Sequence, residues 1–334
     1  MDINKEILKL DWEREPKGLY APIAYTLAAG GKRVRPQLAM IGSQLFGGKD
    51  EEVLPAALAL EVFHNFTLLH DDVMDKAEVR RGRPTVHIQW NENTAILSGD
   101  QMMIEAYTLL SKVPERALAR VLQLFNKMAT EICEGQQYDV DFEQKSHVTI
   151  DEYLMMIRLK TSVLLANALQ IGAYIAGAND KEQEALYQFG IHIGLAFQIQ
   201  DDILDVWGDP KTFGKAVGGD IGCNKKTFVY LEAMRRVGDE AKGERREAMR
   251  RTGDEAMRRV GEELEDWYGQ VLDDNKEKIA RVKEIFEQLG VKEACEQVVR
   301  EYTQKALDIL ETLPQNAATE ELRQLAEKLL VRSV

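Results

Sequence analysis

The sequence predicts an all-α fold, organised as one large helical bundle. Residues that favour helices (Ala, Leu, Glu, Gln, Lys, Arg and Met) dominate long stretches of the 334-residue chain, and it contains only 8 prolines. Apolar residues make up 45% of the chain, which is enough for a sizeable core. The sequence shows no alternating strand pattern and no glycine-rich nucleotide loop.

Helical periodicity is clearest in five segments that are bounded by turn signals. These segments are residues 51–75, 94–113, 117–143, 161–178 and 184–209. Turn-forming residues lie at 46–50, 177–180 and 208–220. The most apolar segment, 161–178, contains Ser162, Asn167 and Gln170, so we expect a helix buried in a bundle and no membrane span.

The net charge and the cysteine content limit the possible partners and the expected cellular setting of the protein. The net charge is -13 and no basic stripe appears, which argues against nucleic acid as a partner. An acidic protein that binds an anion needs metal ions or a local cluster of Lys and Arg. The three cysteines, Cys133, Cys223 and Cys295, form no paired motif, and the N-terminus does not resemble a signal peptide, so we expect a reduced, cytoplasmic setting.

One segment stands apart from the rest. Near-copies of a charged nonapeptide begin at Ala233, Ala248 and Ala256, with irregular spacing that does not fit a solenoid. We interpret residues 233–264 as a charged insertion within a single domain that spans residues 1–334.

Two acidic triplets end two apolar helices. Asp71 and Asp75 are four residues apart and share one helix face, with Asp72 at its rim. One such cluster alone would more often be a solvated helix end. Asp201, Asp202 and Asp205 repeat the same spacing, however, and if the two helices face each other the carboxylates would bind Mg²⁺ ions, with a diphosphate between them.

Four short basic clusters complement the acids. Each alone would be read as solvated surface, but together they indicate two anion sites, one through metal and one through direct contact with Arg and Lys. The basic residues are Lys32, Arg33, Arg35, Arg80, Arg81, Lys160, Lys215, Lys225 and Lys226.

The motifs GGKRVRP, LLHDDVMD, RRGRPT, FQIQDDILD and GKAVGGDIGCNKKTF occur in this order over residues 28–228. In this respect the chain resembles the trans-isoprenyl diphosphate synthases. The resemblance implies the isoprenoid synthase fold, a helical bundle around a central apolar cavity, in a homodimer. It implies elongation of an allylic diphosphate with isopentenyl diphosphate. The repeated insertion departs from the family's usual pattern.

The resemblance also implies roles for individual residues. Mg²⁺, about three ions per site, would be bound by Asp71, Asp75, Asp201 and Asp205, with Asp72 and Asp202 around them. The allylic diphosphate would be held by Arg80, Lys160 and Lys215, bordered by Thr161 and Gln198 and closed over by Lys225. Isopentenyl diphosphate would be held without metal by Lys32, Arg33, Arg35, Arg81 and His64, although His64 alone would suit a hydrogen-bonded core position.

Two phenylalanines below the first triplet bear on product length. Phe66 and Phe63 lie about 7.5 Å and about 12 Å along the helix from Asp71. This arrangement resembles archaeal-type geranylgeranyl diphosphate synthases. Ordinary core packing of both rings, and a farnesyl product, are the alternatives.

Other functions fit less well. A class I terpene cyclase would not need the Lys32–Arg35 cluster or the second acidic triplet. A non-catalytic synthase subunit would be expected to lose acidic residues, and both triplets are complete.

Overall fold

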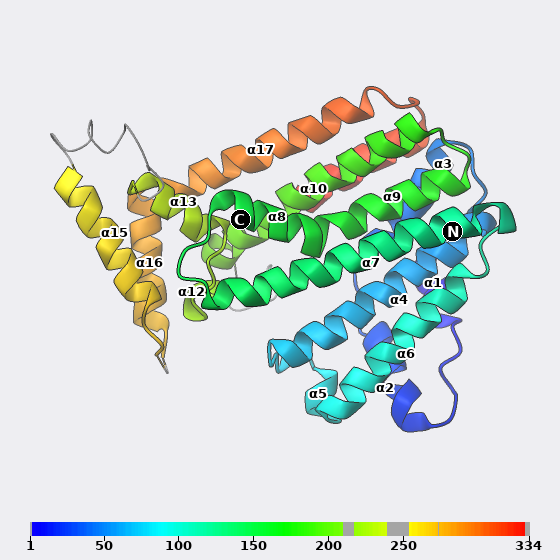
Figure 1. Cartoon of the computed structure of the whole chain (residues 1–334), viewed down its shortest axis with the longest axis horizontal. Helices are drawn as coiled ribbons and strands as arrows, with labels where there is room; N and C mark the ends of the chain where they lie inside the picture. The colour runs from blue at the N-terminus through cyan, green and yellow to red at the C-terminus, as the bar shows by residue number, and fades with distance from the viewer. Residues whose placement is uncertain (1, 210–216, 239–253, 273, 331–334) are drawn as a thin grey trace. The chain divides into compact units, whose positions relative to one another are not determined.

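The computed structural model describes residues 2–209, 217–238, 254–272 and 274–330 and is almost entirely helical (Figure 1). The helices are α1 (Ile3–Leu8), α2 (Lys17–Ala28), α3 (Val34–Leu45), α4 (Asp50–Met74), α5 (Val86–Gln89), α6 (Glu92–Leu110), α7 (Glu115–Gln144), α8 (Ile150–Ile157), the π-helical turn η1 (Arg158–Ser162), α9 (Val163–Ile175), α10 (Asp180–Trp207), α12 (Gly219–Gly222), α13 (Phe228–Arg236), α15 (Asp254–Tyr268), α16 (Lys276–Gln288), α17 (Val291–Leu310) and α18 (Ala317–Leu330). The all-α prediction is confirmed, and α4, α6, α7, α9 and α10 correspond to the five predicted segments.

The chain divides into two compact units. The first contains residues 1–130, 164–190 and 308–324, and the second contains residues 131–163, 191–307 and 325–334. The first acidic triplet belongs to the first unit and the second triplet to the second unit. The predicted insertion at 233–264 falls in the second unit, where residues 239–253 lie outside the described part of the chain.

In the first unit α4 packs against both α3 and α6 (Figure 1). Three acidic residues in the first turn of α4, Asp50, Glu51 and Glu52, complement the positive end of its helix dipole. Asn91 caps α6, because its side chain accepts a hydrogen bond from the backbone of Thr94. Both helices therefore begin with local signals that are visible in the sequence.

Two glycines let α9 approach α3 closely. A Cβ atom built on Gly42 would lie 2.5 Å from the carbonyl oxygen of Leu169, and one on Gly172 would lie 2.0 Å from that of Ala39. No side chain fits at such distances, so the two backbones are in direct contact. This packing buries α9, the segment that the sequence predicted to be buried.

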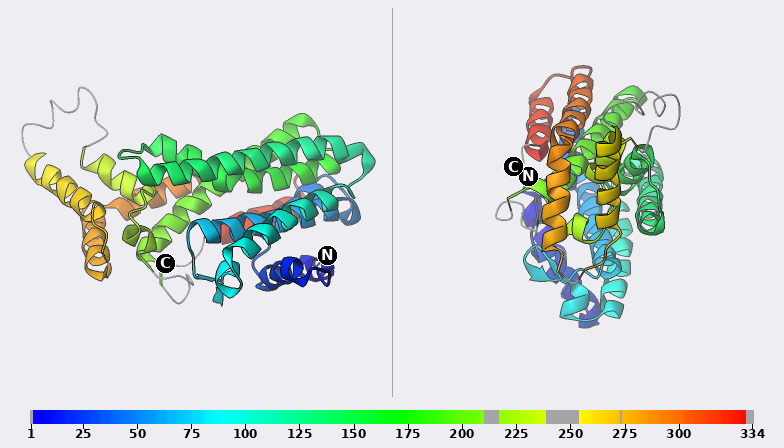
Figure 2. Two further views of the ribbon diagram at one scale, coloured as in Figure 1. Left: turned by 60° about the horizontal axis from the view of Figure 1, so that its bottom comes forward. Right: turned by 90° about the vertical axis from the view of Figure 1, so that its left-hand side faces the viewer.

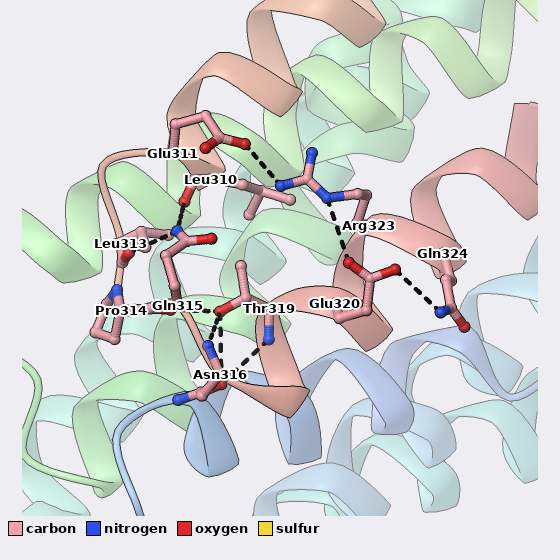
Figure 3. A network of polar contacts seen from close by, with 10 residues as sticks. All are labelled: Leu310, Glu311, Leu313, Pro314, Gln315, Asn316, Thr319, Glu320, Arg323 and Gln324. Carbon is pink, nitrogen blue, oxygen red and sulfur yellow. Dashed lines mark hydrogen bonds and ion pairs between the residues drawn. The ribbon is translucent and has the colours of Figure 1, made fainter.

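The end of α17 and the start of α18 are fixed to α3 by one asparagine (Figure 3). The Asn316 side chain caps α18 by accepting hydrogen bonds from the backbone of Ala318 and Thr319. Its amide also donates to the carbonyl of Leu45 at 3.0 Å. Arg323 of α18 forms an ion pair with Glu311 just beyond α17 at 2.7 Å (Figure 3).

In the second unit α15 and α16 form a helical hairpin, and the two helices lie side by side in every view (Figure 2). Arg281 of α16 makes a two-pronged ion pair with Glu263 of α15, at 2.5 Å and 3.0 Å. Leu264 is fully buried. The last part of the predicted insertion is therefore a packed helix.

Two helical segments, Asp50–Met74 and Ile150–Ile175, are long and apolar enough to cross a membrane. Their most apolar windows are 67% and 72% buried inside the protein. Burial of this extent is typical of core helices, and it agrees with the predicted burial of residues 161–178.

We expect Gly172→Ala to destabilise the protein by about 1–3 kcal/mol, because the new methyl group would clash with a backbone carbonyl. Gly18→Ala in α2 is the matched control: a Cβ atom added there would have no other atom within 4 Å, so the helix should gain about 0.5–1 kcal/mol. Thermal unfolding measures both changes. Equal midpoints for the two variants would contradict the close contact between α3 and α9.

Candidate active site

The first acidic triplet lies at the C-terminal end of α4. The backbone N–H of Asp75 donates to the carbonyl of Asp71 at 2.8 Å, so the two residues are one helical turn apart, as predicted. Asp71 is half-buried and Asp75 is exposed. Asp72 is only 5% exposed, and it points into the protein where the sequence placed it at a rim.

Asp72 pairs with Arg80 through a small hairpin that follows α4. Arg80 Nε donates to Asp72 Oδ1 at 2.7 Å. Burial raises the pKa of Asp72, and the neighbouring guanidinium opposes that rise. The predicted allylic diphosphate ligand Arg80 is therefore held by a carboxylate of the first triplet.

The hairpin was not predicted from the sequence. It pairs β1 (Val79–Arg80) with β2 (Arg83–Pro84) in antiparallel register. Its two turn residues, Arg81 and Gly82, have φ angles of 52° and 72°, as in a type I′ turn. Arginine rarely adopts this conformation. The RRGRP motif also lacks the Asn-Gly pair that usually signals such a turn, so the sequence does not reveal the hairpin.

Arg81 is anchored on the double-glycine turn of the GGKRVRP motif. Its guanidinium donates to the carbonyl of Gly30. A Cβ atom on Gly31, whose φ is 138°, would lie 3.1 Å from the same guanidinium. Gly31 therefore leaves room for this arginine, whereas Gly30, where a Cβ atom would meet nothing, is favoured by its own φ of 75°.

Arg33 points away from solvent and forms a buried ion pair. Its Nη1 donates to Glu61 of α4 at 2.6 Å, its Nη2 donates to the carbonyl of Leu27 at 2.6 Å, and its Nε donates to Asn4 at 3.2 Å. Asn65 donates to the same carboxylate at 3.1 Å. The predicted role of Arg33 in substrate binding remains a prediction, but these bonds already use all three guanidinium nitrogens.

Lys32, Arg35 and His64, which were assigned to the same diphosphate as Arg33, lie in different environments. Arg33 begins α3 in a left-handed conformation (φ 48°), and Lys32 is exposed. Burial lowers the pKa of Arg35 to about 10, while Glu61 opposes this effect. Burial and the charge of Arg35 depress the pKa of His64 well below its ordinary value, so this imidazole is neutral at pH 7.

A concentration of positive charge thus lies in the first unit. The charges of Arg33, Arg35, Arg80 and Arg81 all lower the pKa of His64. A pocket beside them is lined by Arg80, Arg81, Asn65 and Asp72, among others. The structure therefore places Arg33, Arg35, Arg80 and Arg81 near His64, while Lys32 is exposed. Their roles in diphosphate binding stay predictions.

The second unit contains a pocket of about 140 Å³. Five predicted site residues line it: Lys160, Thr161, Gln198, Asp202 and Lys225. They come from η1, α10 and the loop after α12. Lys215 lies outside the described residues.

Lys160 and Thr161 lie within the π-helical turn η1. Two glycines pack against it: a Cβ atom on Gly135 would lie 2.4 Å from the backbone nitrogen of Lys160, and one on Gly194 would lie 2.6 Å from Ser162. A π turn often marks a functional site, because the extra residue displaces neighbouring side chains. The periodicity of the sequence does not reveal it.

A chain of hydrogen bonds orders the pocket wall. Thr161 donates to Gln198 at 3.2 Å, and Gln198 donates to Asp202 at 3.3 Å. Asp202 also accepts from the Tyr153 hydroxyl at 2.6 Å and from the Phe228 backbone at 3.2 Å. Burial and the charge of Asp220 raise the pKa of Asp202 well above its ordinary value.

The other two members of the second triplet differ in exposure. Asp201 is half-buried, like Asp71. Asp205 is buried and accepts a hydrogen bond from the backbone of Asp220 at 3.1 Å. This bond attaches α10 to the loop that carries Lys225.

The pocket also contains residues that the sequence did not single out. Asp139 accepts from Lys160 at 2.6 Å and is therefore its counter-ion. Tyr153 and Asp220 line the same wall. Asp139 lies on a polar stretch of α7 where several acids occur, so only the tertiary contact with Lys160 distinguishes it.

The carboxylates suit Mg²⁺ that is shared with a substrate. Within the described residues, no three His, Cys, Asp or Glu side chains lie close enough together to hold a metal ion on their own. Mg²⁺ commonly binds through one or two carboxylates together with substrate phosphates and water. Asp71 and Asp75, as an i, i+4 pair at a helix end, provide this donor set.

Phe63 and Phe66 form part of an aromatic cluster with Phe125 and Tyr107. Phe63 is 1% exposed, and its ring centroid lies 5.1 Å from that of Phe125 and 5.4 Å from that of Phe66. Tyr107 continues the cluster at 5.3 Å from Phe125. Phe66 is only half-buried, as is Tyr107, so these two rings have accessible surface.

We expect Glu61→Ala to destabilise the protein by about 3–5 kcal/mol, because Arg33 would remain buried without its carboxylate. The double variant Arg33→Met/Glu61→Leu should lose much less stability, because it leaves no unpaired charge buried. Glu52→Ala, which breaks the more exposed pair with Arg116, is the control and should have a far smaller effect. Urea unfolding measures all three, and a double variant as unstable as Glu61→Ala would contradict the ion-pair interpretation.

Known proteins resemble this chain in sequence. The sequence profile of the family described as polyprenyl synthetase matches residues 16–266. Over 332 residues the chain is 35% identical to a geranylgeranyl pyrophosphate synthase of Geoglobus acetivorans, covering 99% of this chain and 96% of that protein. It is 34% identical to a geranylfarnesyl diphosphate synthase of Natronomonas pharaonis, covering 96% and 92%.

A solved structure agrees with these relatives. The crystal structure of a geranylgeranyl pyrophosphate synthase superposes with a TM-score of 0.88 at 42% identity, and the match covers 100% of both chains. The resemblance inferred from the motifs is confirmed. The chain belongs to the polyprenyl synthetase family and is a prenyltransferase.

Proposed function

We propose that the protein condenses isopentenyl diphosphate head-to-tail with allylic diphosphates and releases all-trans geranylgeranyl diphosphate. The observation that carries this proposal is the pocket that joins Lys160, Thr161 and Gln198 of two packed helices to Lys225. It offers cations for a diphosphate beside neutral oxygen dipoles. The names of the relatives support the same reaction class.

The two diphosphates would be recognised differently. Arg80, Lys160, Lys215 and Lys225 would hold the allylic diphosphate, whose other ligand is Mg²⁺ bound by Asp71, Asp75 and Asp201. Lys32, Arg35, Arg81 and His64 would hold isopentenyl diphosphate without metal. His64 is neutral in the absence of substrate, so it can donate one hydrogen bond without adding a buried charge.

The chemistry follows from this charge distribution. Bound Mg²⁺ would stabilise negative charge on the leaving diphosphate. Lys160, Lys225 and Arg80 would add to that stabilisation as the allylic C–O bond breaks. The double bond of isopentenyl diphosphate then attacks the allylic cation, and the released diphosphate accepts the proton that is lost.

Thr161 and Gln198 would act on the allylic cation. Their side-chain oxygens line the pocket and are held by the hydrogen bonds from Thr161 to Gln198 and from Gln198 to Asp202. Fixed oxygen dipoles stabilise a cation without trapping it, whereas mobile water would quench it. Asp202 and Tyr153 would keep these dipoles in place.

We further propose a homodimer in the cytoplasm, with each chain forming one domain. The surface of α6 supports self-association: Ile96, Leu97 and Ile104 are 42%, 59% and 58% exposed. Residues seven and eight positions apart lie on one face of a helix, so these side chains form one apolar stripe. Such a stripe is a suitable contact surface for a second copy.

The test is to incubate the protein with Mg²⁺, isopentenyl diphosphate and, separately, dimethylallyl, geranyl and farnesyl diphosphates, and to separate the dephosphorylated products by length. We expect geranylgeraniol, and no product after chelation of Mg²⁺. Asp71→Asn, Asp75→Asn and Asp201→Asn should each reduce turnover about 10²-fold or more, because charge stabilisation at the leaving group is lost. Asp151→Asn, an exposed site on α8, is the control.

Other results would point elsewhere. A farnesol product would support the proposed reaction but would show that elongation stops at a shorter product. Cyclic hydrocarbons would indicate a cyclase, and folded protein without any elongation would indicate a non-catalytic subunit. Normal turnover in all three asparagine variants would refute the proposed metal ligands.

Phe66 would set the end of the product chain. Phe66→Ala should shift the product from C20 towards C25 or longer, because it removes the accessible one of the two rings below the first triplet. Phe63→Ala should have a smaller effect, since this ring is already covered. Phe189→Ala, which removes a buried ring outside the cluster, should leave product length unchanged. Unchanged products from both cluster variants would show that the rings serve only core packing.

A further inference from the structure

The α15–α16 hairpin contains a lysine with no exposed surface. Lys278 lies in the first turn of α16, is 0% exposed, and ranks among the largest fully buried side chains of the described residues. Burying an ammonium group costs free energy unless its hydrogens are bound. The contacts of Lys278 therefore indicate what this charge does.

The ammonium of Lys278 bridges two neutral oxygens. Nζ donates to the side-chain oxygen of Asn224 and, at 3.0 Å, to the carbonyl of Gln270. Asn224 Nδ2 donates to the same carbonyl at 3.1 Å. The ring of Tyr268 provides a third contact, with its centroid 5.8 Å from Nζ. Three segments of the second unit thus meet at one buried charge.

Asn224 connects this charge to the candidate active site. It directly precedes Lys225 and Lys226, and all three residues line the pocket. Its backbone adopts a left-handed conformation with φ 58°, which asparagine tolerates better than most residues. The conformation of this one residue sets the direction in which the following lysines leave the loop.

The neighbouring residue of α16 fixes the other end of the same loop. The side chain of Ile279 packs on Gly218, where a Cβ atom would lie 2.6 Å away. The backbone N–H of Lys225 donates to the carbonyl of Asp220 at 2.9 Å. Two consecutive residues of α16 therefore hold the loop at Gly218 and at Asn224.

We propose that Lys278 is a positioning residue for diphosphate binding, acting through Asn224 to orient Lys225 in the pocket. The inference rests on the proposed function, because Lys225 is assigned there to the allylic diphosphate. The α15–α16 hairpin would then have a role, which is to hold in place the loop that contains Asn224, Lys225 and Lys226. A methionine has a similar length and no desolvation cost, so the space at position 278 does not itself require a charge.

The experiment compares Lys278→Met, Asn224→Gly and the double variant with the unaltered protein. We expect Lys278→Met to retain or raise the thermal midpoint and to increase KM for the allylic diphosphate about five- to tenfold, with KM for isopentenyl diphosphate unchanged. Asn224→Gly keeps the positive φ without strain and removes the amide, so it should match this effect. Because both changes break one interaction, the double variant should add little.

A binding measurement separates this inference from the proposed function. Calorimetric titration with inorganic pyrophosphate and Mg²⁺ needs no turnover, and its Kd should weaken by the same factor in Lys278→Met and in Asn224→Gly. Lys276→Met, two residues away with a 91% exposed side chain, makes the same charge change and should alter nothing.

The outcomes are distinct. KM and Kd within twofold of the unaltered protein, in folded Lys278→Met, would overturn the positioning role, as would fully additive effects in the double variant. If Lys278→Met fails to fold, Asn224→Gly is the deciding variant, since it keeps Lys278 and its hydrogen bond to the carbonyl of Gln270. If the unaltered protein makes no elongated product, the proposed function fails. The pyrophosphate titration still tests whether Lys278 and Asn224 position the loop for diphosphate binding.

Discussion

In the part of the chain that the structure describes, the fold depends on pairing buried charges with an opposite charge or a fixed dipole. Within the first unit Arg33 is neutralised by Glu61 and Arg80 by Asp72. Within the second unit Lys160 pairs with Asp139. An unpaired charge at Arg33, whose side chain is almost fully buried, would cost several kcal/mol, so Glu61 is a necessary partner. Each unit thus holds candidate site residues in ion pairs before any substrate binds.

Apolar helices supply the framework for these pairs. The acids and bases lie at the ends of α4 and α10 and in η1, while the bodies of the helices are buried. Glycines such as Gly135 and Gly194 remove side chains where helices must approach the π turn. The close packing keeps Lys160 and Thr161 fixed, and fixed groups would need no reorganisation in the proposed reaction.

Much of this could be predicted from the sequence, because it follows from local rules. Helical periodicity located α4 and α10, and the i, i+4 spacing placed Asp71 and Asp75 on one turn. The remainder depends on contacts between distant residues. The inward direction of Arg33 follows from Glu61, the π turn needs the helices that surround it, and the I′ turn at Arg81 is held by Gly30. Nothing near Lys278 in the sequence marks that residue as buried.

The ion pairs also bear on how a diphosphate would enter. A phosphate that binds Lys160 or Arg80 would lie beside Asp139 or Asp72, the carboxylates that already pair with these cations. The repulsion between two unit charges 4 Å apart is about 4 kcal/mol at an effective dielectric constant of 20. A divalent cation near these carboxylates would reduce that cost. The proposed need for metal would then follow from the resting ion pairs as well as from the charge of the leaving group.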